Sequence, residues 1–261
     1  MHTERHVPSP LLSPFLIGAI EGWELSNGAQ ARLREVPFPG IPLIFGIEGG
    51  WQVDTDRHES FVAGLHARPT FVQPDAPNWS CIELRLTPIA AHRILGLAMH
   101  ELSDLTVALE DVVPTAATVT DRIRDAGSWF ERFELIEAFM LRRLAESRTP
   151  APEVEWSWER LRRTAGCAPI GPMATEIGWS HRRLIARFRE QVGMAPKAVA
   201  RVMRFDHAVQ AIRSAPHGLA DVAYDCGYFD QAHMTRDFRD LGGTTPRAFR
   251  ASLLASGGVA A

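Results

Sequence analysis

The sequence predicts an α+β protein in which a β-rich N-terminal domain is followed by an all-α C-terminal domain. Between residues 16 and 86, short apolar runs alternate with segments rich in Gly, Pro, Asp and Asn, whereas beyond residue 156 apolar residues recur at helical spacing. The charge also divides, because residues 1–150 hold 13 basic and 20 acidic side chains and residues 151–261 hold 15 basic and 11 acidic ones. The net charge of -3 is therefore the sum of an acidic half and a basic half, and the basic half suggests a module that binds a polyanion.

The N-terminal domain is expected to span residues 1–146 and to begin with strands. Its apolar runs predict strands at 15–23, 31–36, 41–47, 61–65, 70–74 and 81–86. Helical periodicity then predicts helices at 89–96, 116–126 and 128–146, with a short turn at 100–105. The last of these helices has one apolar face, which we expect to pack on the β-rich unit or on a partner subunit.

The rest of the chain is predicted to be a linker, a helical domain and a tail. Residues 147–155 carry two prolines and little apolar content, which is typical of a linker. The helical domain is expected at 156–254, and the tail at 255–261 is expected to be disordered. Helices are predicted at 156–164, 171–177, 181–192, 197–214, 219–226, 231–241 and from 246.

The helical domain contains an internal repeat. Ala174 and Gly178 have counterparts 49 residues later in Ala223 and Gly227. Further positions match at an offset of 50: Ser180, Leu184, Phe188, Arg189, Gly193 and Pro196 correspond to Asp230, Met234, Phe238, Arg239, Gly243 and Pro246. The unit therefore occurs twice, with one extra residue in the second turn.

Each unit, at about 171–192 and 219–241, has the pattern of a helix-turn-helix. The small alanine allows the two helices to approach closely, and the glycine four residues later allows the positive φ of a sharp turn. Ser180 or Asp230 can then cap the second helix. The apolar pair of that helix faces the core at i and i+4, which leaves the opposite face polar.

The polar face of each second helix carries side chains that suit the major groove of DNA. These are His181, Arg182, Arg183 and Arg187 in the first unit, and Gln231, His233, Thr235 and Arg236 in the second. Ser180, at the start of the first of these helices, is counted with them as a DNA-binding residue. Arginine can donate two hydrogen bonds to guanine, glutamine can pair with adenine, and threonine can contact a thymine methyl group or a base edge. Most charged helix faces are only solvated, but two matched copies in the basic half favour DNA binding.

The segment GLADVAYDCGYFDQAHMTRDFRDLGGTTPRAFR closely resembles the signature of the AraC/XylS family of bacterial transcription regulators. GPMATEIGWSHRRLIARFREQVGMAPK resembles the less uniform first unit of that family, and the whole resemblance covers about 154–250. It implies two helix-turn-helix subdomains joined by a long helix at 197–214, with recognition helices in major-groove segments about 34 Å apart.

The resemblance also implies which residues meet DNA. The base-reading surface falls on Arg182, Ile185 and Ala186 in the first unit and on Gln231, Ala232, His233 and Arg236 in the second. Arg189, Lys197 and Arg239 are interpreted as phosphate contacts, which position a protein without reading sequence. Ile185 and Ala186 replace residues that are often polar, and Arg187 replaces a usually apolar one, so the first helix either reads through methyl groups and arginines or sits rotated. His233 is open to a second interpretation, as a structural residue at the helix terminus.

The N-terminal segment resembles the one that precedes the DNA-binding part in a subset of this family, through VPFPGIPLIFGI, FVAGLHARPTF and LRLTPIAAHRILG. This implies a β-rich, cupin-like domain for sensing or dimerisation. Its aromatic residues could line a ligand pocket but more often fill a β core; they are Trp23, Phe45, Trp51, Phe61, Phe71 and Trp79. Cys81 is interpreted as a buried strand residue.

No pattern of residues supports catalysis or a bound metal. His58, His66, His92 and His100 lack the spacing of a metal site, and neither a nucleophile elbow nor a dinucleotide fingerprint is present. We therefore expect no enzyme activity, no cofactor and no metal. The three cysteines are far apart and fit reduced thiols, and no apolar run approaches the roughly 20 residues of a membrane span.

The sequence thus predicts a cytoplasmic bacterial transcription regulator that binds specific double-stranded promoter DNA and does not bind a membrane. RNA polymerase, a small-molecule effector and a second copy of the chain are its candidate partners. Two other classes stay open, namely an architectural protein that binds DNA without selectivity and an enzyme with a DNA-binding appendage.

Overall fold

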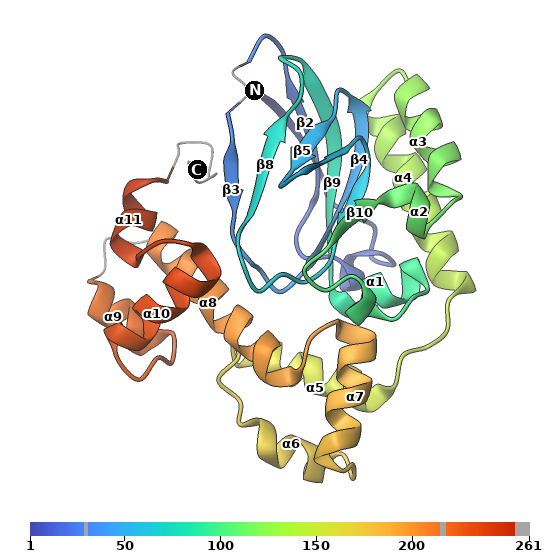
Figure 1. Cartoon of the computed structure of the whole chain (residues 1–261). Helices are drawn as coiled ribbons and strands as arrows, with labels where there is room; N and C mark the ends of the chain where they lie inside the picture. Colours follow the sequence, from blue (N-terminus) through green and yellow to red (C-terminus); the bar gives the residue numbers. More distant parts are fainter. Residues whose placement is uncertain (29–30, 215–217, 254–261) are drawn as a thin grey trace.

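The computed structural model describes residues 1–28, 31–214 and 218–253. The tail predicted at 255–261 lies outside these residues. A β-rich half with flanking helices is followed by an entirely helical half, which confirms the predicted α+β fold class (Figure 1).

The β-rich half contains two antiparallel sheets. The larger has the order β1-β2-β9-β4-β7-β10 and the smaller the order β3-β8-β5-β6. The strands are β1 (His2–His6), β2 (Ile20–Leu25), β3 (Leu33–Glu35), β4 (Ile41–Glu48), β5 (Trp51–Val53), β6 (Asp56–His58), β7 (Phe61–Ala63), β8 (Thr70–Pro74), β9 (Trp79–Leu86) and β10 (Thr106–Ala108).

Alternating side chains of the larger sheet enter two different apolar clusters. Leu43 and Phe45 of β4 belong to the main cluster, which helices cover, whereas Ile44 belongs to a second cluster with Trp51 and Phe61. This period of two is what a strand buried on both faces requires. The second cluster draws residues from both sheets and therefore lies between them.

Most of the aromatic residues singled out in the sequence fill this β core. Trp51 and Phe61 are buried in the second cluster, Trp23 and Trp79 are half-buried against it, and Phe45 is fully buried in the main cluster. Phe71 is half-buried beneath the Arg32 guanidinium, 4.3 Å from its ring centre. Cys81 is buried, as predicted, and this burial raises the pKa of its thiol.

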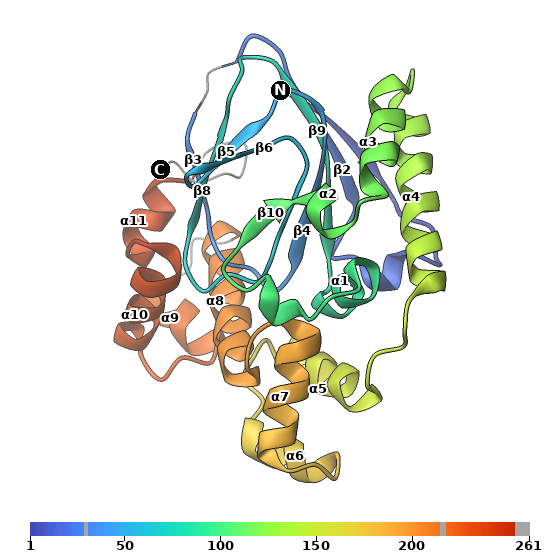
Figure 2. The same cartoon turned by 45° about the vertical axis from the view of Figure 1, so that its right-hand side comes forward.

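α3 (Ala116–Asp125) and α4 (Trp129–Glu146) lie along one face of the larger sheet, and α1 (Pro88–Leu95) lies at one end of its strands (Figure 2). The other helices of this half are α2 (Leu109–Val112) and the 3-10 helices η1 (Ser13–Phe15) and η2 (Met99–Glu101). The apolar face of α4 packs on the β-rich unit, where Phe139 meets Phe45 edge to face at 6.1 Å. The buried Glu137 of α4 also accepts hydrogen bonds at 2.9 Å from the Ser9 N–H and from His6 Nε2.

The helical half consists of α5 (Pro152–Arg163), α6 (Ile170–Glu176), α7 (His181–Val192), α8 (Pro196–Ser214), α9 (Leu219–Asp225), α10 (Gln231–Gly242) and α11 (Pro246–Ala251). The expectation of a linker throughout 147–155 was wrong for its last four residues. Pro152 is compatible with the first turn of a helix, because the N–H that proline lacks has no partner there in any helix. The acidic residues after it, Glu153 and Glu155, favour the same position.

The apolar cores divide unevenly between the two helix-turn-helix units. Buried residues of α5–α7 and the first part of α8 belong to the same cluster as the β-rich half, whereas those of α9–α11 form a separate cluster with the end of α8. The first unit is therefore continuous with the N-terminal half, and the second unit has its own core. In the part of the chain that the structure describes, no helix is long and apolar enough to cross a membrane.

Four strands were missed in the sequence, each for a physical reason. β1 is an edge strand made of polar residues, so it lacks an apolar alternation. β5 and β6 are three-residue strands joined by a two-residue turn, in which Asp54 has a φ of 50°. β10 is equally short and lies at the opposite edge of the larger sheet.

Candidate nucleic-acid interface

The two helix-turn-helix units have the same turn. Gly178 and Gly227 have φ values of +70° and +73°, in the left-handed region where glycine avoids the strain of a Cβ atom. In each turn the residue after the glycine donates its N–H to the carbonyl of the repeated alanine, from Trp179 to Ala174 at 2.8 Å and from Tyr228 to Ala223 at 2.9 Å. The internal repeat read from the sequence is therefore a repeat of backbone geometry.

The second helix of each unit begins at the predicted cap. Ser180 Oγ accepts from the N–H of Arg183 at 3.2 Å, and Asp230 Oδ1 accepts from the N–H of His233 at 2.6 Å. These side chains satisfy N–H groups that the helix leaves without a partner.

One face of each second helix is packed into the domain. Leu184 and Phe188 of α7, and Met234 and Phe238 of α10, are each 0% exposed. Because residues at i and i+4 lie on one face, the opposite face of each helix is turned to solvent.

The predicted DNA-binding residues lie on this solvent face. The exposed ones are Ser180, His181, Arg182, Arg183, Ala186, Arg187, Gln231, Ala232 and Arg236, and the half-exposed ones are Ile185, His233 and Thr235. The predicted phosphate contacts Arg189, Lys197 and Arg239 are also exposed. Each unit thus presents a strip of polar and cationic side chains along its second helix.

Two arginines of the first strip are held by neighbours. The Arg183 guanidinium lies 4.4 Å from the ring centre of Trp179, and Arg187 donates to Glu190 at 2.8 Å. Within residues 1–28, 31–214 and 218–253, no hydrogen bond or ion pair restrains the side chains of Arg182 and Arg236. These two can reorient toward a ligand without breaking an internal contact.

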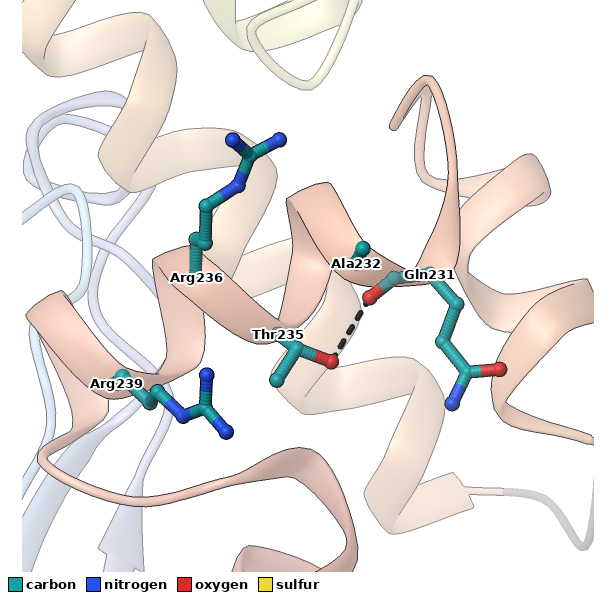
Figure 3. A pocket seen from close by; sticks show the side chains of 5 residues that line it. All are labelled: Gln231, Ala232, Thr235, Arg236 and Arg239. Carbon is teal, nitrogen blue, oxygen red and sulfur yellow. Dashed lines mark hydrogen bonds between the residues drawn. The ribbon is translucent and has the colours of Figure 1, made fainter.

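The strip of α10 lines an open hollow of about 620 Å³, formed by Gln231, Ala232, Thr235, Arg236 and Arg239. Figure 3 shows that the side chains of Arg236 and Gln231 extend away from the helix in different directions. The Thr235 hydroxyl instead donates to the Gln231 carbonyl at 2.8 Å, which turns its methyl group outward from that bond. The hollow therefore combines charge, an amide and small side chains, which suits the edges of base pairs.

His233 supports the structural interpretation left open in the sequence. Its Nδ1 accepts from the N–H of Phe229 at 3.5 Å, and its ring meets Tyr228 edge to face at 5.1 Å. With Nδ1 as the acceptor, the proton of the neutral ring is on Nε2.

The sequence did not reveal a part-buried ion pair that links α8 to α10. Arg201 of α8 donates from Nε to Asp237 at 2.7 Å and from Nη2 to Asp240 at 2.5 Å. Asp237 is only 3% exposed, at a position of α10 that faces the core. Burial, and then the carboxylate of Asp237, raise the pKa of the nearby Tyr228 hydroxyl. An acid among the core-facing positions of α10 was the only signal that the sequence contained.

The turn of the second unit also touches the first unit. Cys167, in the connection between α5 and α6, lies with its Sγ 3.9 Å from the Cys226 carbonyl oxygen. A Cβ atom added to Gly227 would collide with this Sγ, whereas one added to Gly178 would meet nothing within 4 Å. Burial raises the pKa of the Cys226 thiol to about 11.

The β-rich half contacts the first unit at the C-terminal end of α7. The Ser103 hydroxyl of the β-rich half donates to the Gly193 carbonyl at 2.9 Å, and the N–H of Ala151, in the linker, donates to Gln191 Oε1 at 3.1 Å. α7 also packs on α1 and η2. These contacts leave the polar strip of α7 exposed.

Comparison with known families finds one match, in the helical half. Residues 173–252 match a family model described as a helix-turn-helix domain. The match begins in α6 and includes both second helices and α11.

The curated relatives resemble part of the chain. The HTH-type transcriptional activators RhaR of Yersinia pseudotuberculosis serotype O:1b (strain IP 31758) and of Yersinia pestis bv. Antiqua (strain Angola) are each 33% identical to it over 75 residues. The aligned segment is 29% of this chain and 26% of each relative, so the chain matches about a quarter of the length of these relatives.

Solved structures with a similar arrangement include ToxT from Vibrio cholerae O395, with a TM-score of 0.47 and 8% identity over 88% of this chain and 95% of that one. Another is the C-terminal domain of AraT, a response regulator from Geobacillus stearothermophilus, with a TM-score of 0.37 and 16% identity over 39% of this chain and 85% of that one.

Proposed function

We propose that this chain, whose residues 173–252 match a family model described as a helix-turn-helix domain, is a sequence-specific DNA-binding regulator of transcription of the AraC type. The observation that carries the proposal is the repeated unit with the same turn, the same cap and an exposed cationic strip on its second helix. A single such helix is common among soluble proteins. Two copies joined by one helix can contact two neighbouring segments of a DNA duplex.

The length of α8 supports recognition of two successive major-groove segments. Its 19 residues give a rod about 28 Å long at ~1.5 Å per residue. This is comparable with the ~34 Å that separates major-groove segments on one face of DNA. In the proposal, Arg182 and Arg236 read base edges, while Arg189, Lys197 and Arg239 contact phosphates.

The contact between the two halves supports a regulatory role for the β-rich domain. Ser103 of this domain donates to the Gly193 carbonyl at the C-terminal end of α7, so a change in the first domain can alter the position of the first recognition helix. We assign to this domain either the binding of a small-molecule effector or the pairing of two copies. In this function the protein acts in the cytoplasm on promoter DNA and through RNA polymerase, and it needs no enzyme activity.

The experiment is selection of duplexes from a random library by the full-length protein, followed by measurement of affinity against salt concentration. Each phosphate that the protein neutralises adds about -0.9 to the log–log slope, so a slope near zero would remove the proposal. Binding of all duplexes with equal affinity would identify an architectural protein instead.

An arginine variant tests the assigned surface. Arg236→Ala is expected to weaken binding to the selected duplex by roughly 1–3 kcal/mol while changing binding to random duplex much less. Arg122→Ala, an exposed arginine on α3 of the β-rich half, is the matched control and leaves both affinities unchanged. Equal losses for the two variants would contradict the assignment.

A further inference from the structure

The second helix-turn-helix unit carries an aromatic side chain that its fold does not use. Phe229 is 93% exposed, the most exposed of the large apolar side chains in the described residues. An exposed apolar residue needs no explanation by itself. The alignment of the two units shows what distinguishes Phe229 from other exposed apolar residues.

The turn hydrogen bonds align the units residue by residue. Trp179 and Tyr228 each donate their N–H to the alanine five residues earlier, so they occupy the same place in the two turns. Their rings also have the same role, since Trp179 packs against the apolar core of the first unit and Tyr228 is 5% exposed in the second. Tyr228 therefore fills the core position of its turn.

The two turns differ immediately after this position. Trp179 is followed directly by the cap Ser180, whereas Phe229 stands between Tyr228 and the cap Asp230. Phe229 is thus the one residue of the second turn that has no counterpart in the first. Neither the core nor the cap requires it.

The backbone on both sides of Phe229 is fixed. Its own N–H donates to His233 Nδ1 at 3.5 Å, and the next residue, Asp230, accepts from the His233 N–H at 2.6 Å. Its neighbour Tyr228 is anchored by the turn hydrogen bond. The backbone of Phe229 is consequently fixed just before the first turn of α10, two residues before Gln231.

We propose that Phe229 is a specificity residue that contacts the 5-methyl group of a thymine in the major groove, next to the base pair that Gln231 meets. The inference rests on the proposed function, because the residues at the N-terminus of a recognition helix are the ones that reach base edges. In the major groove, thymine alone presents a methyl group, and an apolar ring is a suitable partner for it. Removing one such methyl group from an apolar contact corresponds to about a three- to five-fold loss of affinity.

The test replaces each thymine of the selected duplex in turn by deoxyuridine, which deletes only the methyl group. For the full-length protein, one or two positions beside the bases read by α10 are expected to lose about three- to five-fold in affinity. Phe229→Ser is expected to bind the thymine duplex with the same loss and to be insensitive to deoxyuridine at those positions. Phe229→Leu, which keeps an apolar side chain, retains part of the sensitivity.

Tyr224→Ser is the matched control, because Tyr224 is an aromatic residue on α9 that is 83% exposed. It is expected to leave the deoxyuridine profile unchanged. A Phe229→Ser protein with the profile of the unmodified protein would overturn the inference. Unchanged DNA binding together with lost transcription by purified RNA polymerase would also overturn it, and would assign the ring to a protein contact.

The outcomes separate this inference from the proposed function. If the unmodified protein shows no salt-dependent binding to any duplex, both the proposed function and the role of Phe229 are refuted. If it binds a selected duplex in an Arg236-dependent manner and Phe229→Ser has no effect at any thymine, only the role of Phe229 falls.

Discussion

Removing the guanidinium of Arg201 is expected to destabilise the second helix-turn-helix unit more than removing the carboxylate of its partner. The Asp237 side chain is 4% exposed and the Arg201 side chain 37% exposed. Arg201→Met therefore leaves a buried carboxylate without its cation, whereas Asp237→Leu leaves a guanidinium that can still reach water and Asp240.

The magnitude follows from this asymmetry. Breaking a fully buried ion pair costs about 3–5 kcal/mol, and breaking an exposed pair costs about 0–1 kcal/mol. Since one partner here is buried and the other is part-exposed, we expect Arg201→Met to cost about 2 kcal/mol and Asp237→Leu about 1 kcal/mol. The double variant, with an apolar pair in place of the ionic one, is expected to recover most of the loss.

Hydrogen exchange of the α9 and α10 amides measures this effect locally. A loss of about 2 kcal/mol corresponds to roughly 30-fold faster exchange by unfolding of the second unit, and amides of β4 and β9 serve as the internal control. If Arg201→Met proved no more costly than Asp237→Leu, the argument from the buried carboxylate would be refuted.

Three further perturbations test other parts of the structure. Burial alone would raise the pKa of Glu137, but the hydrogen bonds that it accepts from Ser9 and His6 outweigh burial and lower this pKa. Glu137→Gln is expected to destabilise the protein by about 1–2 kcal/mol at pH 7. Thermal melts should show this difference decline as the pH falls below the ordinary carboxyl pKa of 4.5 and through the lowered one. Gly178→Ala is expected to lower the free energy of unfolding by about 1–2 kcal/mol, because residue 178 has a positive φ. Gly227→Ala is expected to lower it clearly more in urea titrations, because the new methyl group also meets a cysteine sulfur. Equal losses for the two variants would contradict the clash. Phe188→Ala and Phe238→Ala are each expected to lower the free energy of unfolding by about 3–5 kcal/mol. Because all the tryptophans precede the second unit, the unfolding transition followed by tryptophan fluorescence should shift only for Phe188→Ala. A shift of this transition in both variants would show that the two cores unfold together.

The helical half was predictable because its signals are local. Gly178, Gly227 and the caps Ser180 and Asp230 act within one turn of chain, and the apolar pairs at i and i+4 depend only on helical periodicity. The sequence therefore located α7 to the residue and α10 to within one residue.

The β-rich half was less predictable because pairing decides its edges. A polar segment such as β1 becomes a strand only because β2 offers it hydrogen bonds, and its five residues pair with β2 in register. The start of α5 was missed for a related reason, since Pro152 is equally compatible with a linker and with a first helical turn.

Packing also decides how the apolar cores divide along the chain. The first helix-turn-helix unit shares one apolar cluster with the β-rich half, through contacts of α7 with α1 and η2 that link residues about 90 positions apart. No local pattern encodes such a contact.

The sequence by itself determined the duplicated unit, its turns and caps, and the polar strips on α7 and α10, because each depends on residues within a few positions of one another. Only the tertiary structure decided that Arg201 holds α10 through Asp237, that the second unit stands on its own core, and that Phe229 is the inserted residue of its turn. These facts depend on which distant residues meet and on the exact register of hydrogen bonds, and both are fixed only when the chain is packed.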